Sequence, residues 1–162
     1  MTIRILITGG TIDCERIEQE DKYVFDKTHL PEMLEQGRCK LNIESQVLFL
    51  KDSIYTTDED REKILQTCKD CTENKIIITH GTDTMPETAR ILGKEIKDKT
   101  IILLGAMIPF NQEKSDALFN LGCAVSAVQS LPKGVYITMN GKIFEWDNVK
   151  KNKELGLFET LK

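Results

Sequence analysis

The chain has 162 residues, of which 40% are hydrophobic and 30% are charged, an ordinary balance for one globular domain with a single core. Its formal net charge of −4 provides no positive surface for nucleic acid or for an anionic membrane. The longest apolar runs, such as Thr100–Leu104, are too short to span a bilayer, and residues 1–7 lack a signal-peptide pattern. We therefore expect a soluble, cytoplasmic protein whose partners are neither nucleic acid nor membrane.

Five cysteines are dispersed along the chain, and their odd number argues against a disulfide framework. Cys68 and Cys71 form a CxxC pair, but this pair lies inside a helical pattern. No second CxxC and no nearby histidine pair completes a zinc site. We interpret the pair as two helix thiols rather than as a redox or metal centre.

Short apolar, β-branched runs alternate with helical patterns along the chain. Strands rich in apolar residues throughout are typical of a parallel sheet with helices on both faces. We therefore predict a doubly wound α/β fold, with a mostly parallel sheet and flanking helices, as a single domain over residues 1–162. In chain order the predicted elements are strands Ile3–Ile7 and Val47–Leu50, helix Asp58–Cys71, strand Lys75–Thr79, helix Thr84–Lys97, strand Thr100–Leu104, helix Ser115–Ser130 and strand Gly134–Thr138.

The segment Ile12–Thr28 differs from the rest because it is polar and has no clear period. An irregular stretch of this length after the first strand is typical of a functional loop or a flexible hairpin. In open α/β sheets, ligands bind at the carboxyl ends of the strands, beside a topological switch point. The residues that follow each predicted strand are therefore the candidates for the site.

The first strand ends in Thr8-Gly-Gly-Thr11, where two glycines allow a sharp turn and close approach to the main chain. A tight turn and half of a phosphate loop are both consistent with this pattern, which lacks a complete GxGxxG or Walker motif. The third strand ends in His80-Gly-Thr-Asp-Thr84, which places a hydroxyl and a carboxylate where a helix begins. Such residues serve as a helix cap, or as a hydroxyl nucleophile beside backbone N–H groups. We expect His80 to be a packed, hydrogen-bonded histidine rather than a catalytic base.

Other strand ends carry weaker patterns. Asp52 and Ser53 suit the binding of a charged amino acid, and a solvated turn is an equally good interpretation. Gly105–Pro109 offers backbone groups and little side-chain chemistry. Lys150 belongs to a run of lysines near the C-terminus, which by itself predicts a solvated surface.

Four motifs become specific when they are taken together. They are Thr8-Gly-Gly-Thr-Ile12, His80-Gly-Thr-Asp-Thr-Met85, Gly105-Ala-Met-Ile-Pro109, and Ser115-Asp116 with Asn120. In this order and spacing they resemble the bacterial-type L-asparaginase family. The resemblance covers essentially the whole chain but corresponds only to the family's N-terminal domain, so we expect a chain that lacks the family's second domain.

The resemblance implies an amidohydrolase that converts L-asparagine to L-aspartate and ammonia through a threonine acyl-enzyme, with L-glutamine as the second candidate substrate. Thr11 is implied as the nucleophile, on a mobile loop of about residues 12–28. Tyr23 corresponds to a tyrosine of that loop that assists Thr11. Thr82, Asp83 and Lys150 are implied as a second cluster, in which Lys150 is matched through the D-x-x-K-x-N pattern of residues 147–152. A threonine hydroxyl needs a base, and a lysine serves only when its pKa is lowered or when it belongs to a proton relay.

The same resemblance implies how the substrate is held. Asp52 and Ser53 correspond to the pair that binds the α-amino and α-carboxylate groups. Asp83 and Thr82 also face the substrate, and backbone groups of Gly10, Gly81 and Ala106 contribute the remaining contacts. No metal or organic cofactor is implied. Family members form homo-oligomers in which a neighbouring chain's second domain completes each pocket, so we expect self-association.

Two other functions remain open. A binding or regulatory module would keep the pocket and sense an amino acid with weak hydrolysis or none, which would suit a chain without the second domain. A glutaminase-type subunit of an amidotransferase would supply ammonia for tRNA-linked amidation. The acidic net charge disfavours this second alternative, because it provides no tRNA-binding surface.

Overall fold

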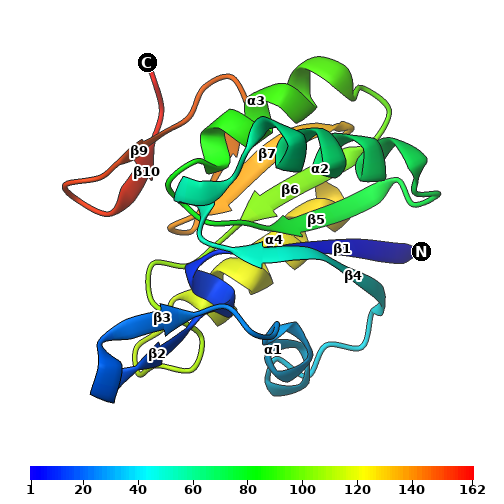
Figure 1. Ribbon diagram of the computed structural model, residues 1–162. Coiled ribbons are helices and arrows are strands. Elements are labelled where there is room, and N and C mark those ends of the chain that lie inside the picture. Colours follow the sequence, from blue (N-terminus) through cyan, green and yellow to red (C-terminus); the bar gives the residue numbers. More distant parts are fainter.

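The computed structural model describes all 162 residues and is built on a six-stranded sheet in the order β4-β1-β5-β6-β7-β8 (Figure 1). The first five of these strands are parallel neighbours, and β8 pairs antiparallel with β7 at one edge. The predicted mostly parallel sheet is therefore confirmed, with β8 as an unpredicted edge strand. The strands are β1 (Thr2–Gly9), β4 (Asn42–Lys51), β5 (Lys75–Thr79), β6 (Thr100–Leu104), β7 (Gly134–Met139) and β8 (Lys142–Glu145).

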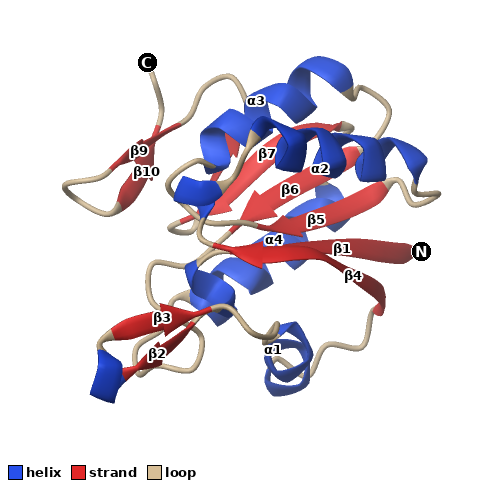
Figure 2. Cartoon of the chain, in the orientation of Figure 1, coloured by secondary structure: helices blue, strands red, loops and turns tan.

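Helices cover both faces of this sheet (Figure 2). On one face lie α2 (Asp58–Asp70) and α3 (Met85–Glu95), and on the other lie α1 (Leu30–Gln36) and α4 (Ala117–Ser130). The three predicted helices are present as α2, α3 and α4, with ends that differ from the prediction by no more than two residues. None of the helices is long and apolar enough to cross a membrane.

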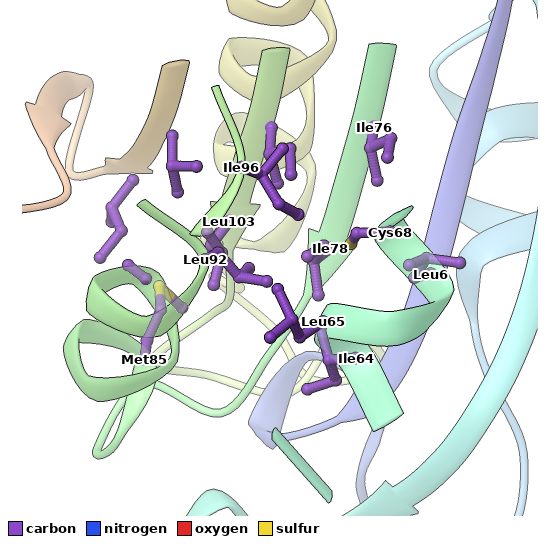
Figure 3. Close-up of a cluster of buried hydrophobic side chains, with 14 of the residues drawn as sticks. Leu6, Ile64, Leu65, Cys68, Ile76, Ile78, Met85, Leu92, Ile96 and Leu103 are labelled. Carbon is purple, nitrogen blue, oxygen red and sulfur yellow. The ribbon is translucent and has the colours of Figure 1, made fainter. Parts of the chain in front are cut away.

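The continuous apolar strands are explained by this two-sided cover. In β5, Ile76 and Ile78 belong to the core beneath α2 and α3, whereas Ile77 belongs to the core against α1 and α4. Successive side chains of a strand point to opposite faces, so a strand buried on both sides needs an apolar residue at every position. Figure 3 shows the first of these cores, where Leu65 and Leu92 point from the two helices toward the sheet.

Two hairpins project from the sheet on the side of the strands' carboxyl ends (Figure 1). The segment predicted as a functional loop or flexible hairpin contains β2 (Glu15–Ile17) and β3 (Lys22–Val24), which pair antiparallel. A second hairpin, β9 (Lys150–Asn152) with β10 (Leu157–Glu159), was not predicted, and neither was α1. Three short 3-10 turns complete the chain: Thr11–Asp13, Glu18–Glu20 and Ser53–Tyr55.

The strand order also locates a binding crevice. From β1 the chain moves to β4 on one side and then crosses to β5 on the other side of β1. This is the order 2-1-3-4-5 of doubly wound sheets, whose ligands bind outside the carboxyl ends of the two strands where the direction reverses. In this chain those two strands are β1 and β5.

Candidate active site

The turns that follow β1 and β5 are in direct contact. Gly10 has φ 82°, and a Cβ added to it would lie 2.4 Å from the Gly81 nitrogen. Only glycine allows both this left-handed conformation and this close approach. Because Gly10 and Gly81 touch, the next residues of the two turns, Thr11 and Thr82, emerge from adjacent segments.

The turn after β4 packs against the same place. A Cβ on Gly81 would meet the Ser53 Oγ at 2.5 Å. The Ser53 Oγ accepts a hydrogen bond from the Thr84 N–H (3.3 Å), and the Thr84 hydroxyl donates to the Ser53 carbonyl oxygen (2.9 Å). Asp52 is half-buried and accepts from the Ile54 N–H (3.1 Å), which caps its 3-10 turn. Three strand ends therefore converge, and they bring Gly10, Gly81 and Ser53 together.

A lysine joins this cluster from the β9–β10 hairpin. The Lys151 Nζ donates to the Thr82 Oγ1 (2.7 Å) and to the Asp83 Oδ1 (2.8 Å). The Lys151 side chain is 9% exposed, and Thr82 is buried. An ammonium that is withdrawn from water needs a carboxylate or other acceptors around it, which Asp83 and Thr82 provide.

Lys150 was predicted to be the lysine of this cluster, and this prediction was wrong, because the lysine that contacts Thr82 and Asp83 is Lys151. The Lys150 Nζ lies 3.3 Å from the Glu159 Oε1, and its side chain is 50% exposed. Lys150 and Glu159 face each other across the hairpin, whereas Lys151 is opposite Phe158. Because adjacent residues of a strand point to opposite faces, only one of the two lysines reaches Thr82, and it is Lys151.

Thr11 opens the 3-10 turn after β1 and is half-buried. The turn is held by its backbone, since the Asp13 N–H donates to the Gly10 carbonyl (3.0 Å). The Cys14 thiol donates to the Thr11 carbonyl (3.3 Å), while the Thr11 hydroxyl makes no hydrogen bond of its own. That hydroxyl is therefore free to act on a ligand.

Tyr23 and Ala106 occupy different positions relative to this cluster. Tyr23 lies on β3 and is 53% exposed, and its hydroxyl makes no hydrogen bond with Thr11. Ala106 is buried just after β6. Asp116 holds the loop after Ala106 in place, because its carboxylate accepts from the backbone N–H groups of Met107 and Ile108 at 3.0 Å. The Ser115-Asp116 motif thus has a structural role in shaping this loop.

His80 supports the turn from beneath, as predicted for a packed histidine. Its Nδ1 lies 2.7 Å from the Gly81 carbonyl oxygen, and its Nε2 lies 2.8 Å from the Thr88 Oγ1. Burial lowers the pKa of the imidazole from 6.5 to about 4, so the ring is neutral at pH 7. A neutral ring with both nitrogens engaged fixes the turn, in agreement with the packed, hydrogen-bonded histidine that was expected.

The CxxC pair lies at the C-terminal end of α2. Cys68 is fully buried in the core, and Cys71 is half-buried at the end of the helix, which confirms their interpretation as helix thiols. Both cysteines are free, and burial raises the pKa of the Cys68 thiol to about 12. No group of three or more His, Cys, Asp or Glu side chains is arranged to hold a metal ion.

Known proteins match this chain over most of its length. A family model described as "Asparaginase, N-terminal" matches residues 2–158. A glutamyl-tRNA(Gln) amidotransferase subunit of Methanococcus vannielii is 36% identical over 153 residues, which are 87% of this chain and 34% of that protein. L-asparaginase 2 of Escherichia coli is 32% identical over 165 residues, which are 92% of this chain and 46% of that protein.

A solved structure gives the same result for the fold. The thermostable L-asparaginase from Thermococcus kodakarensis superposes with a TM-score of 0.86 and 28% sequence identity, covering 99% of this chain and 51% of that chain. The chain thus spans between about a third and a half of the length of these relatives. It belongs to the asparaginase family and corresponds to that family's N-terminal domain.

Proposed function

We propose that the protein is an amidohydrolase that converts L-asparagine to L-aspartate and ammonia through a threonine acyl-enzyme. The observation that carries this proposal is the contact of the Lys151 ammonium with Thr82 and Asp83, next to the turn that presents the unpaired Thr11 hydroxyl. The family membership supports amide hydrolysis as the class of reaction.

In the proposed reaction the Thr11 oxygen attacks the side-chain amide carbon, and its proton passes to the amide nitrogen through the Thr82 and Lys151 network. The tetrahedral oxyanion is stabilised by backbone N–H groups of the glycine turns, an effect typically worth about 3 kcal/mol per donor. Ammonia leaves as the C–N bond breaks and a Thr11 ester forms. Water then hydrolyses this ester, which releases aspartate and restores the hydroxyl.

Substrate orientation is assigned to the groups around this network. Asp83 and Asp52 are the carboxylates that would pair with the α-ammonium group, and Ser53 would hold the α-carboxylate through hydrogen bonds. Gly10, Gly81 and Ala106 offer backbone contacts at the three strand ends. To assist Thr11, Tyr23 would have to move from its exposed position on β3. In the proposed reaction the β2–β3 hairpin therefore closes over the site.

A second candidate function is supported by several of the relatives. These are named as subunits of glutamyl-tRNA(Gln) amidotransferase, and they are 34% to 36% identical to this chain. In that function the same amide hydrolysis would supply ammonia to a partner protein. The chain's net charge of −4 favours the free-standing reaction, since contact with tRNA would need a basic surface.

The test is ammonia release from L-asparagine and L-glutamine by the purified protein, with Thr11→Ala as the control. Release from asparagine that disappears in the variant supports the proposed enzyme. A folded wild-type protein that releases no ammonia from either amide contradicts it. Calorimetric binding of aspartate in that case would support the binding module instead, and release that requires a co-purified protein would support the amidotransferase function.

Two properties of the whole protein are proposed as well. We infer a cytoplasmic location, because all five cysteines are free thiols, as is usual in a reducing compartment. We also infer self-association, which the resemblance to oligomeric asparaginases suggests. Light scattering after size exclusion tests the second inference, and a purely monomeric mass at micromolar concentration would contradict it.

A further inference from the structure

A buried carboxylate lies at the base of the β2–β3 hairpin. Asp13 is 1% exposed and is the last residue of the 3-10 turn that begins with Thr11. Its Oδ1 accepts a hydrogen bond from the His29 N–H (2.8 Å) and another from the Thr28 hydroxyl (2.9 Å). One oxygen of Asp13 therefore links the chain shortly before the hairpin to the chain shortly after it.

Both sides of this junction are tied to fixed parts of the fold. On one side, the Asp13 N–H donates to the Gly10 carbonyl, within the turn that touches Gly81. On the other side, the Thr28 Oγ1 accepts from the Leu30 N–H (3.1 Å) at the start of α1. Asp13 thus connects the turn that carries Thr11 to the helix packed under the sheet.

At the base of the hairpin, the Glu15 Oε1 of β2 also lies 3.3 Å from the Nε2 of the buried His29, and beyond this contact the hairpin's side chains interact at its surface. Its Arg16–Asp21 ion pair (2.8 Å) is internal to the hairpin and exposed, and Tyr23 is also exposed. The bond from His29 to Asp13 is buried and the bond from Thr28 is partly buried, and hydrogen bonds in a low dielectric are stronger than bonds in contact with water. The position of the hairpin relative to Thr11 is therefore set mainly at its base.

A carboxylate is a costly residue for this position. Burial raises the pKa of Asp13, and its Oδ2 has no hydrogen-bond partner. The hydroxyl of Thr79, at the end of β5, also lacks a hydrogen-bond partner. It is close enough to Asp13 to be one of the groups that lower the pKa of its carboxyl. A buried oxygen without a hydrogen-bond partner is unfavourable, so packing alone does not account for an aspartate at this position. What the Asp13 side chain supplies at this position is the acceptor at Oδ1, which binds both Thr28 and His29.

We propose that Asp13 is a positioning residue that clasps the two ends of the β2–β3 hairpin and thereby fixes the Thr11 turn. The inference rests on the proposed function for the role of Thr11, and it assigns no chemical step to Asp13. The function of the clasp requires an acceptor oxygen at Oδ1 and requires no negative charge.

The test compares Asp13→Ala with Asp13→Asn. Alanine removes the acceptor for both Thr28 and His29. Asparagine keeps an acceptor oxygen, and its amide N–H₂ can donate to the unpaired Thr79 hydroxyl. Asp21→Asn is the matched control, because it removes a carboxylate at the exposed tip of the same hairpin, where φ is 47° and asparagine is well tolerated.

The first readout is the rate of tryptic cleavage after Lys27, the site adjacent to Thr28, measured by mass spectrometry. We expect Asp13→Ala to raise this rate about 10-fold or more, the effect of losing one buried and one partly buried hydrogen bond. Asp13→Asn and Asp21→Asn should remain within about twofold of the wild type. This readout does not depend on catalysis, so it tests the clasp even if the proposed function fails.

The second readout is steady-state kinetics of ammonia release. Asp13→Ala should lower kcat and leave KM nearly unchanged, because Asp52, Ser53 and Asp83 still hold the substrate while Thr11 is in place for less of the time. Asp13→Asn should restore kcat. If Asp13→Ala does not fold, Thr28→Val removes one of the two bonds to Asp13, together with the acceptor of the Leu30 N–H, and should give an intermediate cleavage rate.

Two results would overturn the clasp. One is a cleavage rate in Asp13→Ala, or in Thr28→Val, that equals the rate in Asp21→Asn. The other is an Asp13→Asn variant as impaired as the alanine variant, which would show that the charge matters rather than the acceptor.

Discussion

At the scale of single residues, His80 makes the stability of the protein depend on pH in one direction. Burial lowers the pKa of its ring from 6.5 to about 4, so the unfolded chain takes up a proton at a higher pH than the folded chain does. The stability that this residue contributes is fully present above pH 6.5 and is lost as the pH falls toward 4. We expect the free energy of unfolding to fall by about 2 kcal/mol between pH 7 and pH 5 from this residue alone.

Urea unfolding of the wild type and of His80→Gln at both pH values measures this contribution. Glutamine does not titrate in this range, so the variant should lose less stability than the wild type between pH 7 and pH 5. An equal loss in the two proteins would show that other groups cause the pH dependence.

Single residues also show what the sequence can establish about the site. Thr82 and Asp83 were predicted as site residues because they belong to an unusual string, His80-Gly-Thr-Asp-Thr-Met85, at a strand end, and the structure places both in contact with one lysine. The lysine was misassigned because Lys150 and Lys151 are chemically identical neighbours. Only the pairing of β9 with β10 decides which of them faces Thr82, and three-residue strands carry too little alternation to predict their register.

At the scale of elements, the β9–β10 hairpin positions Lys151 through its apolar anchors. Phe158 is 2% exposed, pairs with Lys151 across the hairpin and packs against Phe144, with ring centroids 6.4 Å apart. We expect Phe158→Ala to cost about 3–5 kcal/mol of stability. Much of this loss should be local, because the hairpin is a small unit at the edge of the core. Hydrogen exchange of residues 150–159 should increase more than exchange of β5.

Leu92→Ala is the matched control for this prediction. Leu92 is fully buried on α3, in the same core cluster, and its loss should cost about 2–5 kcal/mol without freeing the hairpin. If both variants increase exchange in the hairpin equally, Phe158 has no local anchoring role.

The central strands were predictable and the peripheral elements were not, for a physical reason. Strands such as β5 and β6 are buried on both faces, so they appear in the sequence as continuous apolar runs. The hairpins have three-residue strands with exposed faces. Helix α1 has only seven residues, which are too few to show a helical pattern of apolar residues in the sequence. These elements are fixed by contacts such as those of Asp13 with Thr28 and His29.

At the scale of the whole molecule, both core clusters share the strands of one sheet. Leu6 of β1 belongs to one cluster and Ile7 to the other. Loss of packing on one face of the sheet would therefore disturb the same strands that support the other face. We therefore expect one cooperative unfolding transition, with a heat-capacity change of about 2 kcal/mol/K for 162 residues. Scanning calorimetry checks this expectation, and two resolved transitions would contradict it.

The most direct test of the proposed site is the initial rate of ammonia release from L-asparagine by Lys151→Met and by Lys150→Met. The two variants lose the same charge at adjacent positions, but only Lys151 contacts Thr82 and Asp83. We predict that Lys151→Met is slower than the wild type by about 100-fold or more. We predict that Lys150→Met stays within about twofold of the wild type, because its exposed pair with Glu159 contributes little. Equal rates for the two variants, or a greater loss in Lys150→Met, would contradict the proposed site.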